Sequence, residues 1–92
     1  MRFDATGSEI IDCTAYNGKM AIISVTVDGN VHLNITMPCM INNGASYCVN
    51  GAGNNIDARV MMSAGKFHID EAHWGTDDKL SSSKLIVRVL NY

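Results

Sequence analysis

Side chains that could hold a metal ion or act in catalysis are scattered along this chain. His68 and His73 flank an acidic pair, but the two histidines are five residues apart. That spacing suits neither one face of a helix nor one face of a strand, where residues on the same side differ by an even number. Cys39 and Cys48 do not form a CxxC pair, which is typical of zinc and redox sites. We therefore expect no metal and no cofactor.

Nucleophilic catalysis would need a nucleophile, a base and an orienting group held close together. Cys39 or Cys48 with His32 or His73 would supply the residue types, but no spacing singles them out. The GxSxG, HExxH and Walker motifs are absent from the sequence. We expect a non-enzymatic protein, with an enzyme that uses Cys39 or Cys48 as its nucleophile as an alternative.

Length, composition and charge narrow the class of protein. The 92 residues, 47% of them hydrophobic and 17% charged, predict a single domain that spans residues 1–92. Seven Lys and Arg stand singly among nine Asp and Glu, for a formal net charge of -2. This distribution argues against direct, sequence-specific nucleic-acid binding. No apolar run approaches the roughly 18 residues of a membrane-spanning helix, so we expect no membrane contact.

The cysteines and the first residues bear on the cellular compartment. Three cysteines cannot complete a disulfide framework, so we expect free thiols, while one bridge between Cys39 and Cys48 stays open. Residues 1–8 contain no apolar stretch of signal-peptide length. We expect a cytoplasmic protein, located in the cytosol of a host cell.

Residues 8–37 carry the clearest pattern. Two turn signals, Asn17-Gly18 and Asp28-Gly29, interrupt an alternation of apolar and polar residues, which predicts an antiparallel meander of three strands. The predicted strands cover residues 9–16, 19–27 and 31–37, and Pro38 ends the last of them.

The alternation also predicts the register of the second turn. A three-residue loop from Asp28 to Asn30 pairs Val25 with Leu33 and makes one face of the hairpin continuously apolar. Its last residue, Asn30, is expected in the left-handed conformation. On the first hairpin, Cys13 would lie opposite Ile22 on an outward side. Either a helix or loop covers these apolar residues, or a partner protein does.

The second half of the chain is harder to interpret. Residues 42–55 are rich in Asn and Gly and predict a long irregular loop, with a short strand at residues 47–49 as an equal alternative. Residues 55–64 fit one short helix that ends at Gly65, although their alternating apolar residues keep a strand open.

The carboxyl-terminal part predicts further strands. Residues 66–70 alternate, residues 75–83 form a polar turn region, and residues 84–90 resemble a central strand covered on both faces. The predicted fold class is therefore α+β, mainly β, with an amino-terminal three-stranded antiparallel meander, further carboxyl-terminal strands and one short helix in a single compact domain.

Surface recognition is the function class that remains. We expect a small protein that binds a larger protein or nucleoprotein assembly, as a monomer or weak homo-oligomer. Compact chains of this kind are frequent among phage-encoded inhibitors of host defence, including anti-CRISPR proteins. Trp74 is either a lid on the core or an interface anchor. The predicted partner-binding residues are Asn43, Tyr47, Asn50, Asn54, Trp74, Asp77 and Asp78.

The alternative is a virion structural protein or capsid decoration component. Such a protein would use a flat β face to form a symmetric oligomer, so the oligomeric state distinguishes it from an inhibitor.

Overall fold

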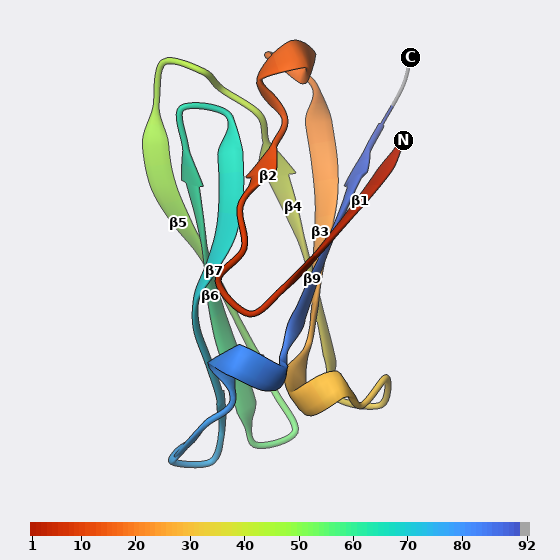
Figure 1. Ribbon diagram of the computed structural model, residues 1–92, viewed down its shortest axis with the longest axis vertical. Helices are drawn as coiled ribbons and strands as arrows, with labels where there is room; N and C mark the ends of the chain where they lie inside the picture. The colour runs from red at the N-terminus through yellow and green to blue at the C-terminus, as the bar shows by residue number, and fades with distance from the viewer. Residues whose placement is uncertain (91–92) are drawn as a thin grey trace.

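Two antiparallel β-sheets packed face to face make up residues 1–90, the part of the chain that the computed structural model describes (Figure 1). The first sheet contains, in spatial order, β1 (Arg2–Thr6), β9 (Lys84–Val89), β3 (Met20–Thr26) and β4 (Asn34–Met40). The second contains β2 (Ile11–Asp12), β7 (Lys66–Trp74), β6 (Ile56–Ser63) and β5 (Ser46–Gly53), with β8 (Asp77–Asp78) beside β7. The mainly-β, antiparallel part of the predicted fold class is confirmed.

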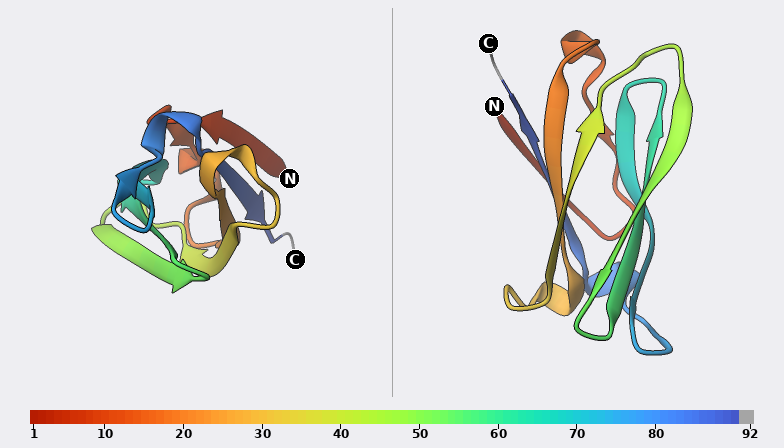
Figure 2. Two further views of the ribbon diagram at one scale, coloured as in Figure 1. Left: turned by 90° about the horizontal axis from the view of Figure 1, so that it is seen from below. Right: turned by 180° about the vertical axis from the view of Figure 1, so that it is seen from behind.

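The core lies between the two sheets. Viewed from below, the strands surround a common interior (Figure 2), and one side of each strand faces it. Phe67, Ile23 and Ile41 are among the largest side chains that are fully buried there. The buried residues of both sheets form one hydrophobic cluster, to which the inward-facing residues of alternating strands contribute.

A glycine allows the two sheets to approach at one side. A Cβ atom added to Gly51 of β5 would lie 2.3 Å from Ile35 Cγ2 and 2.9 Å from Met37 Sδ. Only a residue without a side chain fits at this distance. Gly51 therefore lets β5 fold over the inward side chains of the edge strand β4.

The predicted first strand and first hairpin are wrong. β2 pairs with β7, with Ile11 opposite Phe67, and residues 14–16 form a 3-10 turn, η1 (Thr14–Tyr16). The chain crosses here from the first sheet to the second, so Ile11 and Cys13 are buried in the core instead of lying outward beside Ile22. The Asn17-Gly18 turn does not connect two paired strands. Its Gly18 N–H donates to the carbonyl of Ile41 instead.

The second hairpin exists, and its predicted apolar face is correct, but its register is shifted by two residues. Val25 lies opposite Ile35, not Leu33. A 3-10 turn, η2 (Val27–Gly29), lengthens the connection, and the left-handed residues are Asp28 with φ 55° and Gly29 with φ 68°, not Asn30 with φ −96°. A shift of two keeps the same residues inward, so the hydrophobic pattern alone does not exclude it.

Pro38 does not end its strand. It lies within β4, opposite Ile22, where β4 forms the edge of the first sheet. An edge position tolerates proline because one side of the strand needs no donor for a neighbour.

The long loop predicted for residues 42–55 is wrong, and its equal alternative, a strand at residues 47–49, is confirmed within β5; the predicted helix is a strand too. β5 and β6 form a hairpin across the two-residue turn Asn54-Asn55, whose φ angles of 49° and 65° suit asparagine. The side chains of residues 56–63 alternate between the core and the outer face. The strand that their alternating apolar residues kept open is therefore the one that forms. Within residues 1–90 the helical segments are 3-10 turns, the third being η3 (Leu80–Ser82), so the predicted short helix is absent.

The last strand occupies the central position that its composition predicts. β9 lies between β1 and β3, with Val87 buried on the inner face. Its outer face is not covered as predicted, because Lys84 and Arg88 are exposed there. No helix in residues 1–90 is long and apolar enough to cross a membrane.

Candidate functional site

A β-bulge in β7 shapes the outer face of the second sheet. Val60 of β6 pairs with Ile69, whereas the preceding residue Arg59 pairs with Glu71, so Asp70 is an extra residue. Ile69 and Ala72 are both buried, and the two acidic residues between them point outward. The bulge also puts His68 and His73 on the same face, although their odd spacing predicted opposite faces. The two histidines are still far apart along the strand, because their partners Met61 and Asp57 are four residues apart on β6.

Arg59 holds the bulge together electrostatically. Its Nη2 atom lies 2.5 Å from Asp70 Oδ2 and 3.2 Å from Glu71 Oε2, and its Nε donates to Asp70 Oδ2 at 2.7 Å. The hydrogen bond to Asp70 and the charges of both carboxylates raise the pKa of the Arg59 guanidinium. Since one arginine meets two carboxylates, this cluster remains net negative.

A second polar pair lies lower on the same face. His73 Nδ1 is 2.9 Å from Asp57 Oδ1, across neighbouring strands. This hydrogen bond is the main cause that raises the pKa of His73, and the charges of Asp57, Glu71 and Asp78 add to it. The imidazole is therefore more readily protonated than a free histidine.

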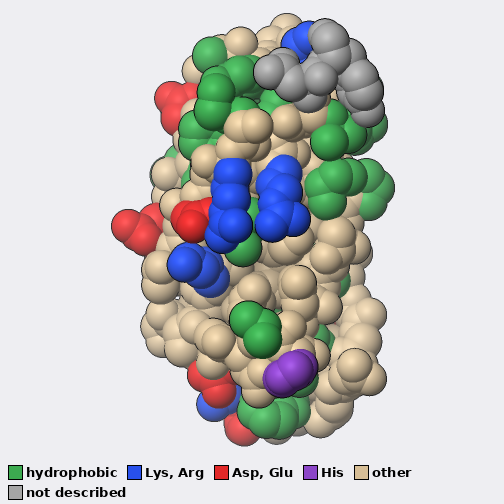
Figure 3. Space-filling view, turned by 90° about the vertical axis from the view of Figure 1, so that its right-hand side faces the viewer, with side chains coloured by type: hydrophobic (Ala, Val, Ile, Leu, Met, Phe, Trp, Pro, Cys, Tyr) green, Lys and Arg blue, Asp and Glu red, His purple; other side chains and the backbone are tan. Residues whose placement is uncertain are grey.

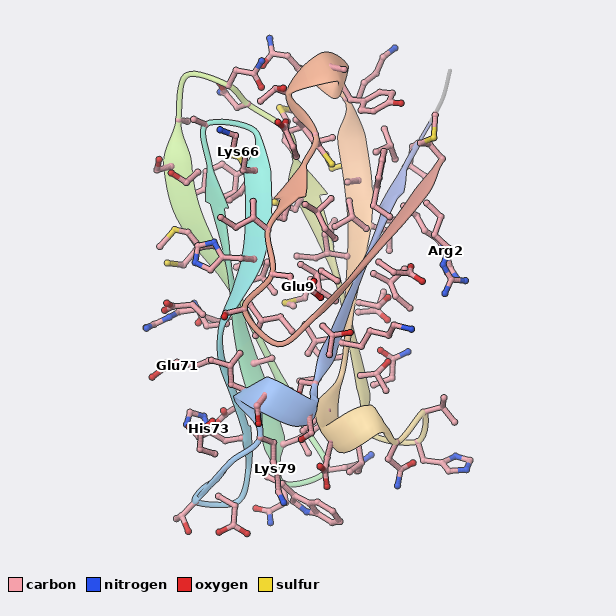
Figure 4. The ribbon with its side chains drawn as sticks, in the orientation of Figure 1. Arg2, Glu9, Lys66, Glu71, His73 and Lys79 are labelled. Atoms are coloured by element: carbon pink, nitrogen blue, oxygen red, sulfur yellow. The ribbon has the colours of Figure 1, made fainter. Side chains whose placement is uncertain are left out.

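These residues line a shallow depression of about 370 Å³ on the outer face of the second sheet. Glu71 and His73 project from the same side of the molecule, opposite the side from which Arg2 projects (Figure 4). The depression is lined by Asp57, Arg59, Glu71 and His73 and by Asn50. Asn50 is the one predicted site residue that lies in this depression.

A second hollow, of about 430 Å³, opens at the lower end of the sandwich as Figure 1 is drawn. Trp74 and Asp77 line it together with Asn55 and Lys79. The Gly75 N–H donates to the carbonyl of Asn55 at 2.7 Å, which joins the β7–β8 turn to the β5–β6 turn. We call the surface formed by Asn54, Asn55 and residues 74–78 the lower rim.

Trp74 is the most distinctive side chain of the lower rim. It pairs with the buried Ile56 but lies at the end of its strand, and it remains 41% exposed. Asp77 lies opposite Trp74 and Asp78 opposite His73 on β8. The structure thus brings four of the seven predicted site residues together, namely Asn54, Trp74, Asp77 and Asp78.

Two predicted site residues lie at the opposite end of the sandwich and make internal contacts. Asn43 donates from Nδ2 to the carbonyl of Thr14 at 2.9 Å, and its N–H donates to Asn17 Oδ1. The Tyr47 hydroxyl donates to the carbonyl of Met40, and burial is the main cause that raises its pKa to about 12. Their role in partner binding stays a prediction.

The cysteines are free in this structure. Cys13 and Cys39 are buried, and burial raises the pKa of both thiols, that of Cys13 to about 11. Cys48 is exposed on β5, where its sulfur lies 3.8 Å from the Met61 sulfur. Among residues 1–90, no group of three or more His, Cys, Asp or Glu side chains could hold a metal ion.

Sequence reasoning overlooked the cluster formed by Asp57, Arg59 and Glu71. The sequence does contain a signal for this cluster. Apolar residues stand at the odd positions 67 and 69 and then at the even positions 72 and 74, and such a change indicates a bulge. Comparisons with protein-family models, curated proteins and solved structures found no match to this chain.

Proposed function

We propose that this protein acts by binding a larger protein or nucleoprotein assembly through the lower rim. The observation that carries the proposal is the 41% exposure of Trp74, the single tryptophan of the chain, at the wall of an open hollow. Tryptophan is among the residues most enriched at the centres of protein interfaces. An exposed indole beside polar turns is an anchor that a partner can enclose.

The charge of the lower rim indicates the chemistry of the partner. Asp77 and Asp78 are both exposed, and on the adjoining outer face Asp57 and Glu71 extend the acidic surface. Such a surface fits a basic patch on the partner, including one that otherwise contacts nucleic acid. Complementary charge would accelerate association, while the indole would supply most of the affinity.

An affinity pull-down from lysate of the native host tests the proposal. The wild-type protein is expected to capture one large assembly at defined stoichiometry, and Trp74→Ala is expected to lose it, because truncating an anchor costs about 2 kcal/mol or more of binding free energy. Val31→Ala is the matched control, since Val31 is an exposed apolar residue, 73% exposed, that does not belong to the lower rim. Equal capture by wild type and Trp74→Ala would exclude the lower rim.

A narrower form of the proposal is a phage-encoded inhibitor of host defence of the anti-CRISPR type. It requires that the captured assembly be a defence complex and that the purified protein inhibit its activity in vitro. Trp74→Ala would then lose inhibition and capture together. A captured assembly that belongs to the virion would instead support the structural alternative.

A further inference from the structure

The outer face of the first sheet carries a cluster of basic side chains. Arg88 lies opposite Arg2 across β9 and β1, and Lys84 lies four residues before Arg88 on the same face of β9. A single carboxylate, that of Asp4, stands among them, 3.0 Å from Arg2 Nε and 3.9 Å from Lys84 Nζ. Figure 3 shows these basic side chains gathered near the middle of this face.

Apolar side chains adjoin this basic cluster on the same face. Met20 lies opposite Met40, and Ile22 lies opposite Pro38 on one side and Arg88 on the other. Met40 is 47% exposed, and the others are half-buried or exposed. Methionine side chains adapt to irregular surfaces, so this end of the face suits contact with another protein.

The outer face of the second sheet has the opposite charge. Its centre and lower half carry four carboxylates, those of Asp57, Asp70, Glu71 and Asp78, against Arg59 and the titratable His73. Above them, Cys48 and Met61 present polarizable sulfur atoms.

On both faces sulfur-bearing side chains lie at the upper end and the opposite charges lie below them, although His68 and Lys66 also stand at the upper end of the second face. On the first sheet the order runs from Met20 through Arg88 to Lys84. On the second it runs from Met61 through Arg59 to Asp57. A second copy in the same orientation would set Met20 and Met40 against Cys48 and Met61, and basic residues against acidic ones.

We propose that this protein associates head to tail, with the outer face of the first sheet of one copy seated on the outer face of the second sheet of another. Such a contact uses two different surfaces, so repetition of it produces a ring or an open filament. Trp74 and Asp77 belong to neither surface, whereas Asp57, Glu71 and Asp78 also adjoin the lower rim, and the proposal goes beyond partner binding through the lower rim.

Analytical ultracentrifugation at several protein concentrations tests the association. The sedimentation coefficient of the wild type is expected to rise with concentration at about 0.05 M salt and to fall towards the monomer value at about 0.5 M, where exposed charges are screened within a few ångströms. A wild type that remains monomeric in low salt across the accessible concentrations would overturn the proposal.

Two charge reversals locate the contact. Arg88→Glu alters the first face and Glu71→Lys the second, and each is expected to weaken association at least tenfold on its own. A mixture of the two is expected to associate again, because the unaltered face of each variant fits the unaltered opposite face of the other. A dimer through two copies of the first face would be insensitive to Glu71→Lys, so that result would contradict a head-to-tail contact.

Asp77→Lys is the matched control for Glu71→Lys, because it changes the net charge equally at the lower rim. It is expected to associate like the wild type while capturing less of the host assembly. Circular dichroism melting of each variant shows that a lost association does not reflect unfolding. The self-association and the partner binding can therefore fail separately.

Discussion

Both ends of the sandwich contain Asn and Gly turns, but the side chains at the two ends make opposite kinds of contact. The upper end consists of η1, the turn at residues 42–45 and the Ala64-Gly65 turn between β6 and β7; the lower rim contains Asn54, Asn55 and Trp74. At the upper end, hydrogen bonds join the segments to one another, from Asn43 to Thr14, from Cys13 to Gly65 and from Ala64 to Ala45. At the lower rim, an indole and two carboxylates face solvent.

The difference shows that a turn rich in Asn and Gly does not by itself indicate a binding surface. Polar side chains that satisfy backbone groups of other segments stabilise the fold. Polar side chains left open to solvent are available to a partner. We therefore expect substitutions at the upper end to lower stability, and substitutions at the lower rim to alter binding.

Gly65→Ala is expected to cause the largest loss of stability. Gly65 has a φ angle of +79°, and an added Cβ atom would lie 2.2 Å from Asn43 Oδ1 and 3.0 Å from Thr14 Cγ2. Backbone strain and the close contact together predict a loss of about 2–4 kcal/mol in the free energy of unfolding. Urea denaturation followed by circular dichroism measures it.

Gly53→Ala is the matched control, at the other end of the molecule. No atom lies within 4 Å of a Cβ atom added to Gly53. Its unfolding free energy should stay within about 0.5 kcal/mol of the wild type. Equal losses of unfolding free energy in Gly65→Ala and Gly53→Ala would contradict the difference between the tightly packed upper end and the exposed lower rim.

Asn43→Ala is expected to have a smaller effect. It removes the hydrogen bond from Nδ2 to Thr14, which contributes about 1 kcal/mol to the free energy of unfolding. It also removes the Oδ1 atom that obstructs a side chain at position 65. The loss in the double variant Asn43→Ala/Gly65→Ala should therefore be smaller than the sum of the two single losses.

The exposed Asn50 of β5 supplies the control for Asn43. Asn50→Ala is expected to change stability by less than about 0.5 kcal/mol, as is usual for surface positions. Strict additivity of the Asn43 and Gly65 substitutions would mean that the two residues do not contact each other.

Much of the fold was predictable, because burial repeats with a period of two along a strand. The buried faces of β3 and β4 and the strand at residues 66–70 follow from alternation, and the central position of β9 follows from its apolar residues on both faces. The register of the β3–β4 hairpin did not follow, since a shift by two keeps the same face inward. The crossing at Ile11 was also hidden, because local alternation does not say to which sheet a strand belongs.

The candidate site was predictable only where residue type indicates exposure. Trp74, Asp77 and Asp78 are close in sequence, so their proximity at one hairpin is local. The contact of Asp57 with His73 joins two strands, and the bulge that directs Asp70 and Glu71 outward shifts the register within one of them. Those placements depend on strand pairing, for which a single sequence holds little information.

The smallest expected effect is a pH dependence where the lower rim meets the outer face of the second sheet. The hydrogen bond to Asp57 is the main cause that raises the pKa of His73 above the value of about 6.5 for an unfolded chain. A raised pKa means that the protonated form is favoured by folding, so this stabilisation is fully present below about pH 6.5. It is lost as the pH rises through the pKa of the folded state.

Titration of the His73 ring resonances by NMR measures this effect directly. Asp57→Asn should lower the pKa of His73 markedly, because it removes the negative hydrogen-bond partner, whereas Asp78→Asn should lower it only slightly, because Asp78 acts by charge alone. An unchanged His73 titration in Asp57→Asn would show that the pair does not form in solution. Since His73 precedes Trp74 in the chain, its protonation also makes the surface beside the indole less acidic, and we expect capture of a basic partner to weaken slightly as the pH falls through this range.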